Sequence, residues 1–80
     1  MPSDKHIFVT GHSNVSWKDA IVKTILETSQ TVKNLNTVEI LKQKAIINEN
    51  KISEYLVDLD ITFKIDPIQR QLSNDDSDLN

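Results

Sequence analysis

The stretch Tyr55–Ile65, which reads YLVDLDITFKI, alternates apolar residues with mostly polar ones along its whole length. Because successive side chains of a β-strand point to opposite faces, this pattern predicts a strand with one apolar and one mostly polar face. The apolar face comprises Tyr55, Val57, Leu59, Ile61, Phe63 and Ile65, and the other comprises Leu56, Asp58, Asp60, Thr62 and Lys64. The apolar face needs a cover, whereas the polar face contacts solvent or an enclosed aqueous space.

One amphipathic segment, over residues 17–32, fits this cover. Ser16 followed by Asp19 is typical of a helix start, where the serine accepts from an early backbone N–H and the acid reaches back. At about 3.6 residues per turn, the predicted sheet-facing stripe comprises Trp17, Ile21, Ile25, Thr28 and Val32. Val22 and Leu26 lie on a flank of that stripe, which indicates either a subunit contact or ordinary exposed residues.

Two further strands complete the pattern. The β-prone run Ile7–Thr10 is followed by turn-forming residues and predicts a first strand. Residues Thr37–Ile47 predict a second strand, and the polar connection Asn48–Lys51 predicts a hairpin to the strand after it. A helical crossover makes the first two strands parallel, with the third antiparallel to both and between them. The sequence therefore predicts an α+β fold of βαββ order, with a three-stranded antiparallel-type sheet packed on one helix.

The second strand is less clearly amphipathic than the third. Simple alternation places Val38, Ile40 and Lys42 on one face, and Glu39, Leu41, Gln43, Ala45 and Ile47 on the other. His6 and His12 flank the first strand too far apart to chelate one ion, so we expect both at the surface.

The size of the chain predicts a small core. Its 80 residues make one domain at most, and such a domain buries only about 60% of the surface that its unfolded chain exposes. The absence of cysteine excludes disulfides, thiolate metal sites and catalytic thiols, so self-association is the remaining support. We expect residues 1–66 to form the domain. Residues 67–80 are too polar and acidic to pack, and we expect them to form a disordered tail.

Composition also disfavours several classes of function. No run approaches the roughly 20 apolar residues of a membrane span, and Ser3–His6 is charged, which predicts a cytoplasmic protein without a membrane partner. The net charge of -3 disfavours binding to nucleic acid, which needs a basic patch. With one glycine and no base beside Ser13 or Ser16, the chain is not expected to be an enzyme. Those serines suit turn and capping roles.

Four features together resemble the dodecin family: Thr10–Ser13 at the end of the first strand, the Ser16–Trp17 helix start, the Thr31–Asn34 helix end and the Tyr55–Phe63 strand. The resemblance covers residues 5–66 in the same element order. It implies a βαββ protomer whose sheet wraps around its helix, assembled as a hollow homododecamer. It also implies a protein that binds and stores a flavin, riboflavin or FMN, between symmetry-related subunits and is not an enzyme.

The chain departs from the flavin-binding members of that family at two positions. Where those members have the tryptophan on which the flavin stacks, this chain has Thr37, and where they have the glutamine that pairs with the flavin edge, it has Leu56. Loss of an aromatic face and of a polar partner predicts weaker flavin binding. In this respect the chain is more similar to the calcium-dodecin subgroup, which shares the Ser-Trp helix start and the shell but lacks the stacking tryptophan.

Two lysines are candidate ligand-binding residues. The resemblance aligns Lys44 and Lys64 with positions where some bacterial dodecins carry an arginine that contacts nucleotide phosphate. A lysine lacks the bidentate fork of an arginine, so the predicted hold on phosphate is weaker. Solvated lysines on a strand are the favoured alternative.

Two carboxylates are candidate metal ligands. Asp58 and Asp60 lie two apart on a strand and point to one face, and oxygen ligands suit calcium or magnesium. Copies around a symmetry axis would build a site, but two carboxylates fall short of the roughly six to eight oxygens that calcium takes, so a solvated sheet face is the favoured alternative. Glu39 and Glu54 are further acids whose faces the pattern leaves open. The predicted function is a small-molecule-binding or storage shell for flavin, or alternatively a shell that binds calcium or is purely structural.

Overall fold

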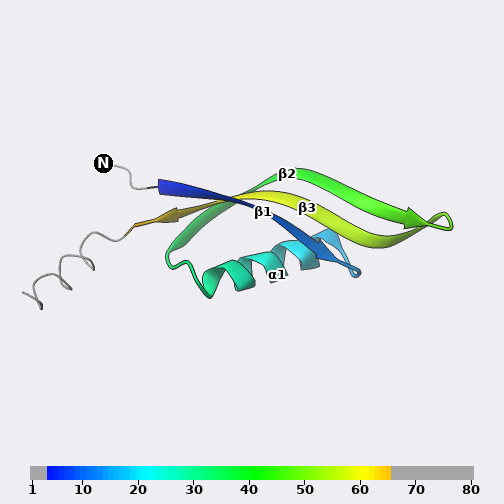
Figure 1. Cartoon of the computed structure of the whole chain (residues 1–80), viewed down its shortest axis with the longest axis horizontal. Helices are drawn as coiled ribbons and strands as arrows, with labels where there is room; N and C mark the ends of the chain where they lie inside the picture. Colours follow the sequence, from blue (N-terminus) through cyan, green and yellow to red (C-terminus); the bar gives the residue numbers. More distant parts are fainter. Residues whose placement is uncertain (1–3, 66–80) are drawn as a thin grey trace, which may run out of the picture.

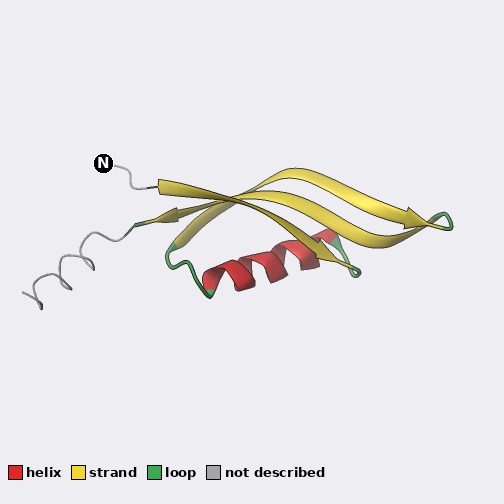
Figure 2. Cartoon of the chain, viewed as in Figure 1, coloured by secondary structure: helices red, strands yellow, loops and turns green. Residues whose placement is uncertain are grey.

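A computed structural model of the protein describes residues 4–65. Its elements are β1 (Asp4–Ser13), α1 (Trp17–Ser29), β2 (Leu35–Asn48) and β3 (Lys51–Lys64). The sheet has the order β1-β3-β2, and both β1 and β2 run antiparallel to β3. The helix α1 lies against one face of the sheet, and the opposite face is uncovered (Figure 1 and Figure 2). The predicted α+β fold of βαββ order, with its third strand in the centre, is confirmed.

β3 supplies the centre of the core, as its alternation predicts. Val57 and Ile61 are each 1% exposed and Leu59 is fully buried. They pack with Ala20 of α1, which is also fully buried. Partly buried apolar residues surround this cluster: Val9, Trp17, Ile21, Leu35 and Val38. The fully buried apolar core of the described chain is therefore small, and additional burial between copies would add to the stability of the protomer.

The face of α1 that meets the sheet differs from the predicted one. Ala20 and Thr24 are buried. The residues of the predicted stripe are only partly buried: Trp17, Ile21, Ile25, Thr28 and Val32. The predicted stripe favoured large apolar side chains, but small residues make the closest contact because a helix near a sheet leaves no room for larger ones. α1 also ends at Ser29 instead of Val32, and Asn34 adopts a positive φ of 62° before β2 begins.

The start of α1 is joined to the end of β1 through a buried serine. The N-cap residue Ser16 accepts from the backbone N–H of Asp19 at 2.9 Å, as predicted. The prediction that Asp19 reaches back is wrong, because the Ser16 N–H donates to the Ser13 hydroxyl at 3.4 Å. The Asp19 carboxylate accepts from the hydroxyl of Ser13 at 2.6 Å. Ser13 is only 1% exposed. The same hydroxyl oxygen accepts from the backbone N–H of Val15 at 2.9 Å. Ser13 thus has a structural role at the turn, consistent with its predicted turn and capping function.

All three strands extend beyond their predicted bounds. β1 was expected at Ile7–Thr10, β2 at Thr37–Ile47 and β3 from Tyr55, whereas the structure extends each of them at one end or both. Strand pairing uses backbone groups, so polar residues at the ends of an apolar run join the ladder once a neighbouring strand is in place. β1 gains residues at both ends, and β3 begins at Lys51 in the hairpin instead of at Tyr55.

β2 contains an irregularity that reverses its faces. Ile40 pairs with Leu59 and Lys42 pairs with Asp58, so Leu41 is an extra residue in β2. Because a one-residue insertion moves later side chains to the opposite face, Lys42 lies with Asp58 and not with Ile40. Gln43 then pairs with Val57 and returns to the helix side. The prediction that placed Lys42 with Val38 and Ile40, and Gln43 and Ala45 opposite them, is therefore wrong.

The β2–β3 hairpin projects beyond the rest of the sheet. Its turn residues Glu49 and Asn50 have positive φ values of 54° and 66°, which is typical of a two-residue type I′ turn. β1 ends opposite Tyr55, so residues 46–54 form a two-stranded hairpin arm (Figure 1). Three isoleucines of this arm are exposed: Ile46 (44%), Ile47 (58%) and Ile52 (43%). An isolated two-stranded ribbon is only marginally stable in water.

Within residues 4–65, α1 is too short and too polar to cross a membrane. The tail expected at 67–80 lies outside the described residues.

Candidate ligand-binding face

The sheet face opposite α1, which we call the outer face, carries polar residues from all three strands. On β3 it comprises the residues that alternate with the buried ones, Leu56, Asp58, Asp60, Thr62 and Lys64. Cross-strand partners point to the same face, so it also includes His6, Phe8, Thr10 and His12 of β1 and Thr37, Glu39, Lys42 and Lys44 of β2. Asp58 and Asp60 share one face, as predicted. Glu39, whose face the sequence left open, lies directly opposite Asp60.

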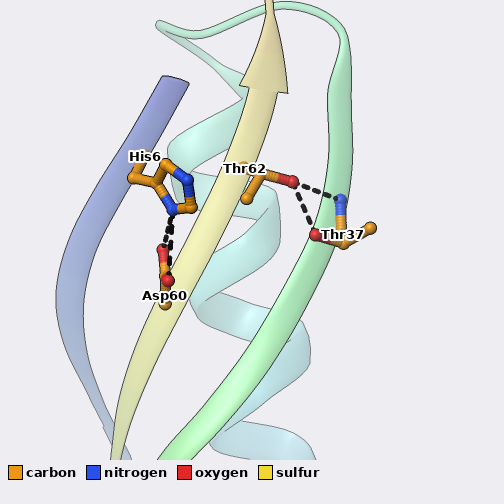
Figure 3. A network of polar contacts seen from close by, with 4 residues as sticks. All are labelled: His6, Thr37, Asp60 and Thr62. Atoms are coloured by element: carbon orange, nitrogen blue, oxygen red, sulfur yellow. Dashed lines mark hydrogen bonds and ion pairs between the residues drawn. The ribbon is translucent and has the colours of Figure 1, made fainter. Parts of the chain in front are cut away.

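Asp60 is held by a histidine from the neighbouring strand. His6 Nδ1 lies 3.0 Å from Asp60 Oδ1 and 3.2 Å from Oδ2 (Figure 3). An ionised carboxylate only accepts hydrogen bonds, so Nδ1 carries the proton. The Asp60 side chain is 13% exposed and that of His6 is 52% exposed. His6 therefore fixes the direction in which the more buried carboxylate points.

Two further cross-strand contacts occupy the same side of the β1–β3 pair. The Thr10 hydroxyl donates to Asp58 Oδ1 at 3.1 Å. Nearer the hairpin arm, His12 Nδ1 lies 2.8 Å from Glu54 Oε2. Both histidines are exposed, as the sequence predicted, but each is paired with a carboxylate.

On the other side of β3, two threonines join β2 to the central strand. Thr62 Oγ1 accepts from the backbone N–H of Thr37 at 3.1 Å, and the two hydroxyl oxygens lie 2.5 Å apart (Figure 3). Thr37, Thr62 and His6 thus form one row across the outer face. The Thr37 side chain satisfies its own hydrogen bond within the sheet and offers no aromatic surface.

Two surface pockets lie beside α1. The first, of about 230 Å³, is at the start of β2 and is lined by Ile25, Leu35, Asn36, Thr37, Val38 and Ile61. The second, of about 260 Å³, is at the edge of β1 and is lined by Thr10, Gly11, His12, Lys23, Thr24 and Glu27. The first pocket is mostly apolar and the second carries charged side chains. Thr37 is the one candidate position from the sequence that lines either of these two pockets.

Comparison with known proteins assigns the chain to one family. A sequence model of the Dodecin family matches residues 4–66. The chain belongs to the dodecin family. A comparison with curated protein sequences gave no match.

Solved structures of dodecins have the same fold. The dodecin from Streptomyces davaonensis is 25% identical, with a TM-score of 0.76 over 81% of this chain and 96% of that one. The calcium dodecin from Mycobacterium tuberculosis, described as having a novel calcium-binding site, is 25% identical, with a TM-score of 0.69 over 80% of this chain and 91% of that one. A variant of the Thermus thermophilus dodecin is 23% identical, with a TM-score of 0.78 over 82% of this chain and 98% of that one.

Thr37 and Leu56, the two positions where the family resemblance implies a departure from flavin binders, lie far apart on the outer face. Thr37 pairs with Thr62, whereas Leu56 lies six residues away along β3. At about 3.3 Å per residue, this separation is roughly 20 Å within one protomer. A single small ligand would therefore contact both positions only if they came from two different copies of the chain.

The two candidate lysines are also separated. Lys44 pairs with Leu56 and Lys64 pairs with Asp4, eight residues further along β3. This corresponds to roughly 26 Å at the usual rise of a strand. Both lysines are exposed. The structure does not bring them together in one protomer, so a phosphate held by both would also need two copies.

The candidate metal ligands share a face but do not form a complete site. Among residues 4–65, no group of three or more histidine, aspartate or glutamate side chains is arranged to hold a metal ion. Asp58 and Asp60 each already accept a hydrogen bond from β1. One protomer therefore offers carboxylates for a shared cation site but not the number of ligands that calcium requires.

The contacts that orient these carboxylates were not predicted from the sequence. His6, Thr10 and His12 reach β3 because β1 pairs with it in a register that aligns Thr10 with Asp58. Alternation alone shows which residues share a face of their own strand, but it does not show which residue of the neighbouring strand is opposite. Knowledge of the β1–β3 register would have placed His6, Thr10 and His12 beside these carboxylates.

Proposed function

We propose that this dodecin is a small-molecule-binding or storage protein that holds its ligand between copies of itself in a homo-oligomeric shell and is not an enzyme. One observation carries the proposal. The candidate positions Thr37, Leu56, Lys44 and Lys64 lie on one uncovered face but too far apart to line a single small site in one protomer. Such a face becomes a binding wall only when a second copy lies opposite it.

Exposed apolar residues support assembly. The hairpin arm exposes three isoleucines, and α1 exposes Val22 (45%) and Leu26 (59%) on the flank that the sequence singled out as a candidate subunit contact. Burial of apolar surface contributes about 25 cal/mol per Å². Contacts through the arm and this flank would add to the small core of the protomer. The family resemblance implies a homododecamer.

The expected ligand by family resemblance is riboflavin or FMN, held weakly. Thr37 and Leu56 remove the aromatic face and the amide that the flavin-binding members use. An aromatic pair contributes roughly 0.5–1.5 kcal/mol beyond area burial, and an unpaired polar edge costs about 1–3 kcal/mol. Flavin storage at this site therefore requires contacts other than stacking on a tryptophan and pairing with a glutamine amide.

A titration of the purified oligomer with riboflavin and FMN, followed by flavin fluorescence, tests the first candidate. Saturable quenching supports flavin storage without the tryptophan or the glutamine. A linear response up to high flavin concentration would remove flavin as the ligand.

Calcium is the second candidate, favoured by the carboxylates of the outer face. Asp58 and Asp60 lie side by side on β3, and Glu39 is opposite Asp60. Carboxylates directly opposite each other repel, and a divalent cation between copies of this group would relieve the repulsion. The calcium dodecin of Mycobacterium tuberculosis is a relative of this chain with a calcium-binding site.

Thermal unfolding with and without calcium tests this candidate. A ligand present at about 100 times its Kd stabilises the folded state by about 2.7 kcal/mol, so calcium should raise the Tm of the native chain. The double variant Asp58→Asn/Asp60→Asn should lose that rise, while Glu27→Gln on α1 should keep it. The same Tm with calcium and with a chelator would exclude a specific calcium site.

A further inference from the structure

Phe8 is an aromatic residue that the described protomer leaves in solvent. Its side chain is 69% exposed, the highest value among the large hydrophobic residues of the described chain. It lies on the outer face, since its partner in the register is Asp60. β1 is an edge strand of the sheet, so on one side Phe8 has no neighbouring strand within the described residues.

The ring of Phe8 is held in a defined orientation by His6. The two rings are stacked, with centroids 6.3 Å apart and an angle of 17° between their planes. The same imidazole contacts Asp60 through Nδ1 (Figure 3). One side chain therefore contacts both an aromatic ring and a carboxylate. We call Phe8 and His6 the β1 platform.

The β1 platform lies beside carboxylates. Directly opposite residues of an antiparallel pair have Cβ atoms about 5 Å apart, which places Asp60 next to Phe8. Asp58 is at the diagonal position and is oriented by Thr10 at 3.1 Å. Glu39 follows Asp60 in the same row across the sheet. A ligand on this platform therefore has an aromatic surface beneath it and negative charge along one edge.

This arrangement selects one class of ligand. The face of an aromatic ring attracts cations, and a carboxylate accepts hydrogen bonds from cationic N–H groups. A planar heteroaromatic cation satisfies both. The phosphate of FMN would instead be repelled by Asp58 and Asp60. We propose that the β1 platform stacks a planar aromatic cation whose N–H groups face Asp58 and Asp60.

The platform lies at the opposite edge of the sheet from Thr37. The row of His6 runs across β3 at Thr62 to Thr37 on β2, and Phe8 lies in the next row. Two strand spacings amount to about 10 Å. The proposal goes beyond flavin or calcium storage, because neither of those functions uses Phe8.

Three planar tricyclic probes that differ in charge test the proposal on the full-length oligomer. Proflavine is a cation at neutral pH, riboflavin is neutral, and FMN carries a phosphate. Fluorescence titration measures the Kd of each. We expect proflavine to bind at least about ten-fold more tightly than FMN, with an affinity that falls as salt is added.

Variants locate the site. Phe8→Leu keeps an apolar side chain but removes the ring, and it should weaken proflavine binding by about ten-fold. Asp60→Asn should weaken proflavine but leave any riboflavin binding unchanged. Val15→Ala changes an apolar residue that is 67% exposed in the turn after β1 and serves as the matched control, with no expected effect on the proflavine Kd.

Three results would overturn the proposal. They are the absence of saturable proflavine binding, an unchanged Kd in Phe8→Leu, and a smaller oligomer for Phe8→Leu in light scattering, which would assign Phe8 to a subunit contact. Because Phe8 is exposed, the Tm of Phe8→Leu should match that of the native chain, and this measurement separates loss of binding from loss of fold. Failure of the proposal leaves the flavin and calcium tests unaffected.

Discussion

Gly11 of β1 lies so close to Thr24 of α1 that a Cβ atom at position 11 would collide with Thr24 Oγ1. The added Cβ atom would also lie 3.1 Å from the carbonyl oxygen of Ala20. The φ angle of Gly11 is not positive, so the glycine is required by space and not by backbone conformation. This close approach lets Ala20 reach the core on β3.

Gly11→Ala should therefore destabilise the protein. Alanine in place of glycine in a strand is otherwise stabilising by roughly 0.5–1 kcal/mol, but overpacking at this contact should cost about 1–3 kcal/mol. Chemical denaturation measures the difference. Gly11→Ala/Thr24→Ala removes the colliding hydroxyl and should recover part of the loss. A single variant as stable as the native chain would show that the helix moves away at no cost.

Ser13→Ala should also destabilise the protein, by about 1–3 kcal/mol. The change removes the donor to Asp19 and the acceptor for the N–H of Val15 at a site that is 1% exposed, so buried polar groups lose their partners. Ser53→Ala is the control, because its hydroxyl also bonds a backbone group but is exposed. Equal denaturation midpoints for the two variants would contradict a structural role for Ser13.

The parts of the fold that the sequence predicted depend on features within one element. The alternation of Tyr55–Ile65 fixes which residues of β3 are buried, and the Asn48–Lys51 connection fixes the hairpin. The capping hydrogen bond of Ser16 is equally local. In each of these cases a short segment determines its own geometry, and the structure confirms the prediction.

The parts that could not be predicted depend on contacts between elements. The burial of Thr24 follows from the absence of a side chain at Gly11, which lies in another element. The extra residue Leu41 changes the faces of β2 without any glycine or proline to indicate a bulge. The pairing of His6 with Asp60 requires the β1–β3 register. Alternation therefore indicated which residues of β3 share the outer face, but not which residues of β1 contact them.

The hairpin arm should control assembly. Ile47→Glu/Ile52→Glu places charge at residues that are 58% and 43% exposed in the protomer, so it should not disturb the core. If the arm packs between copies, burial of these charges is unfavourable and the oligomer should dissociate, with a lower Tm. Lys51→Glu changes charge in the same arm without replacing an apolar side chain and should keep the native mass. Light scattering decides, and an unchanged mass for the double variant would exclude the arm as a subunit contact.

Thr37→Trp/Leu56→Gln should increase affinity for riboflavin. The tryptophan restores an aromatic face at the start of β2 and the glutamine restores a polar partner, roughly 20 Å away in the same protomer and hence contributed by a second copy to any one ligand. Each gain is worth about 1 kcal/mol, so the single variants should bind several-fold more tightly and the double variant at least about ten-fold more tightly.

Thr31→Trp, which adds an aromatic residue on the exposed turn after α1, controls for nonspecific quenching. Because Thr37→Trp also breaks the contact with Thr62, Thr62→Val measures the cost of that loss alone. A double variant that binds no better than the native chain would show that the outer face near Thr37 is not a flavin wall in this dodecin.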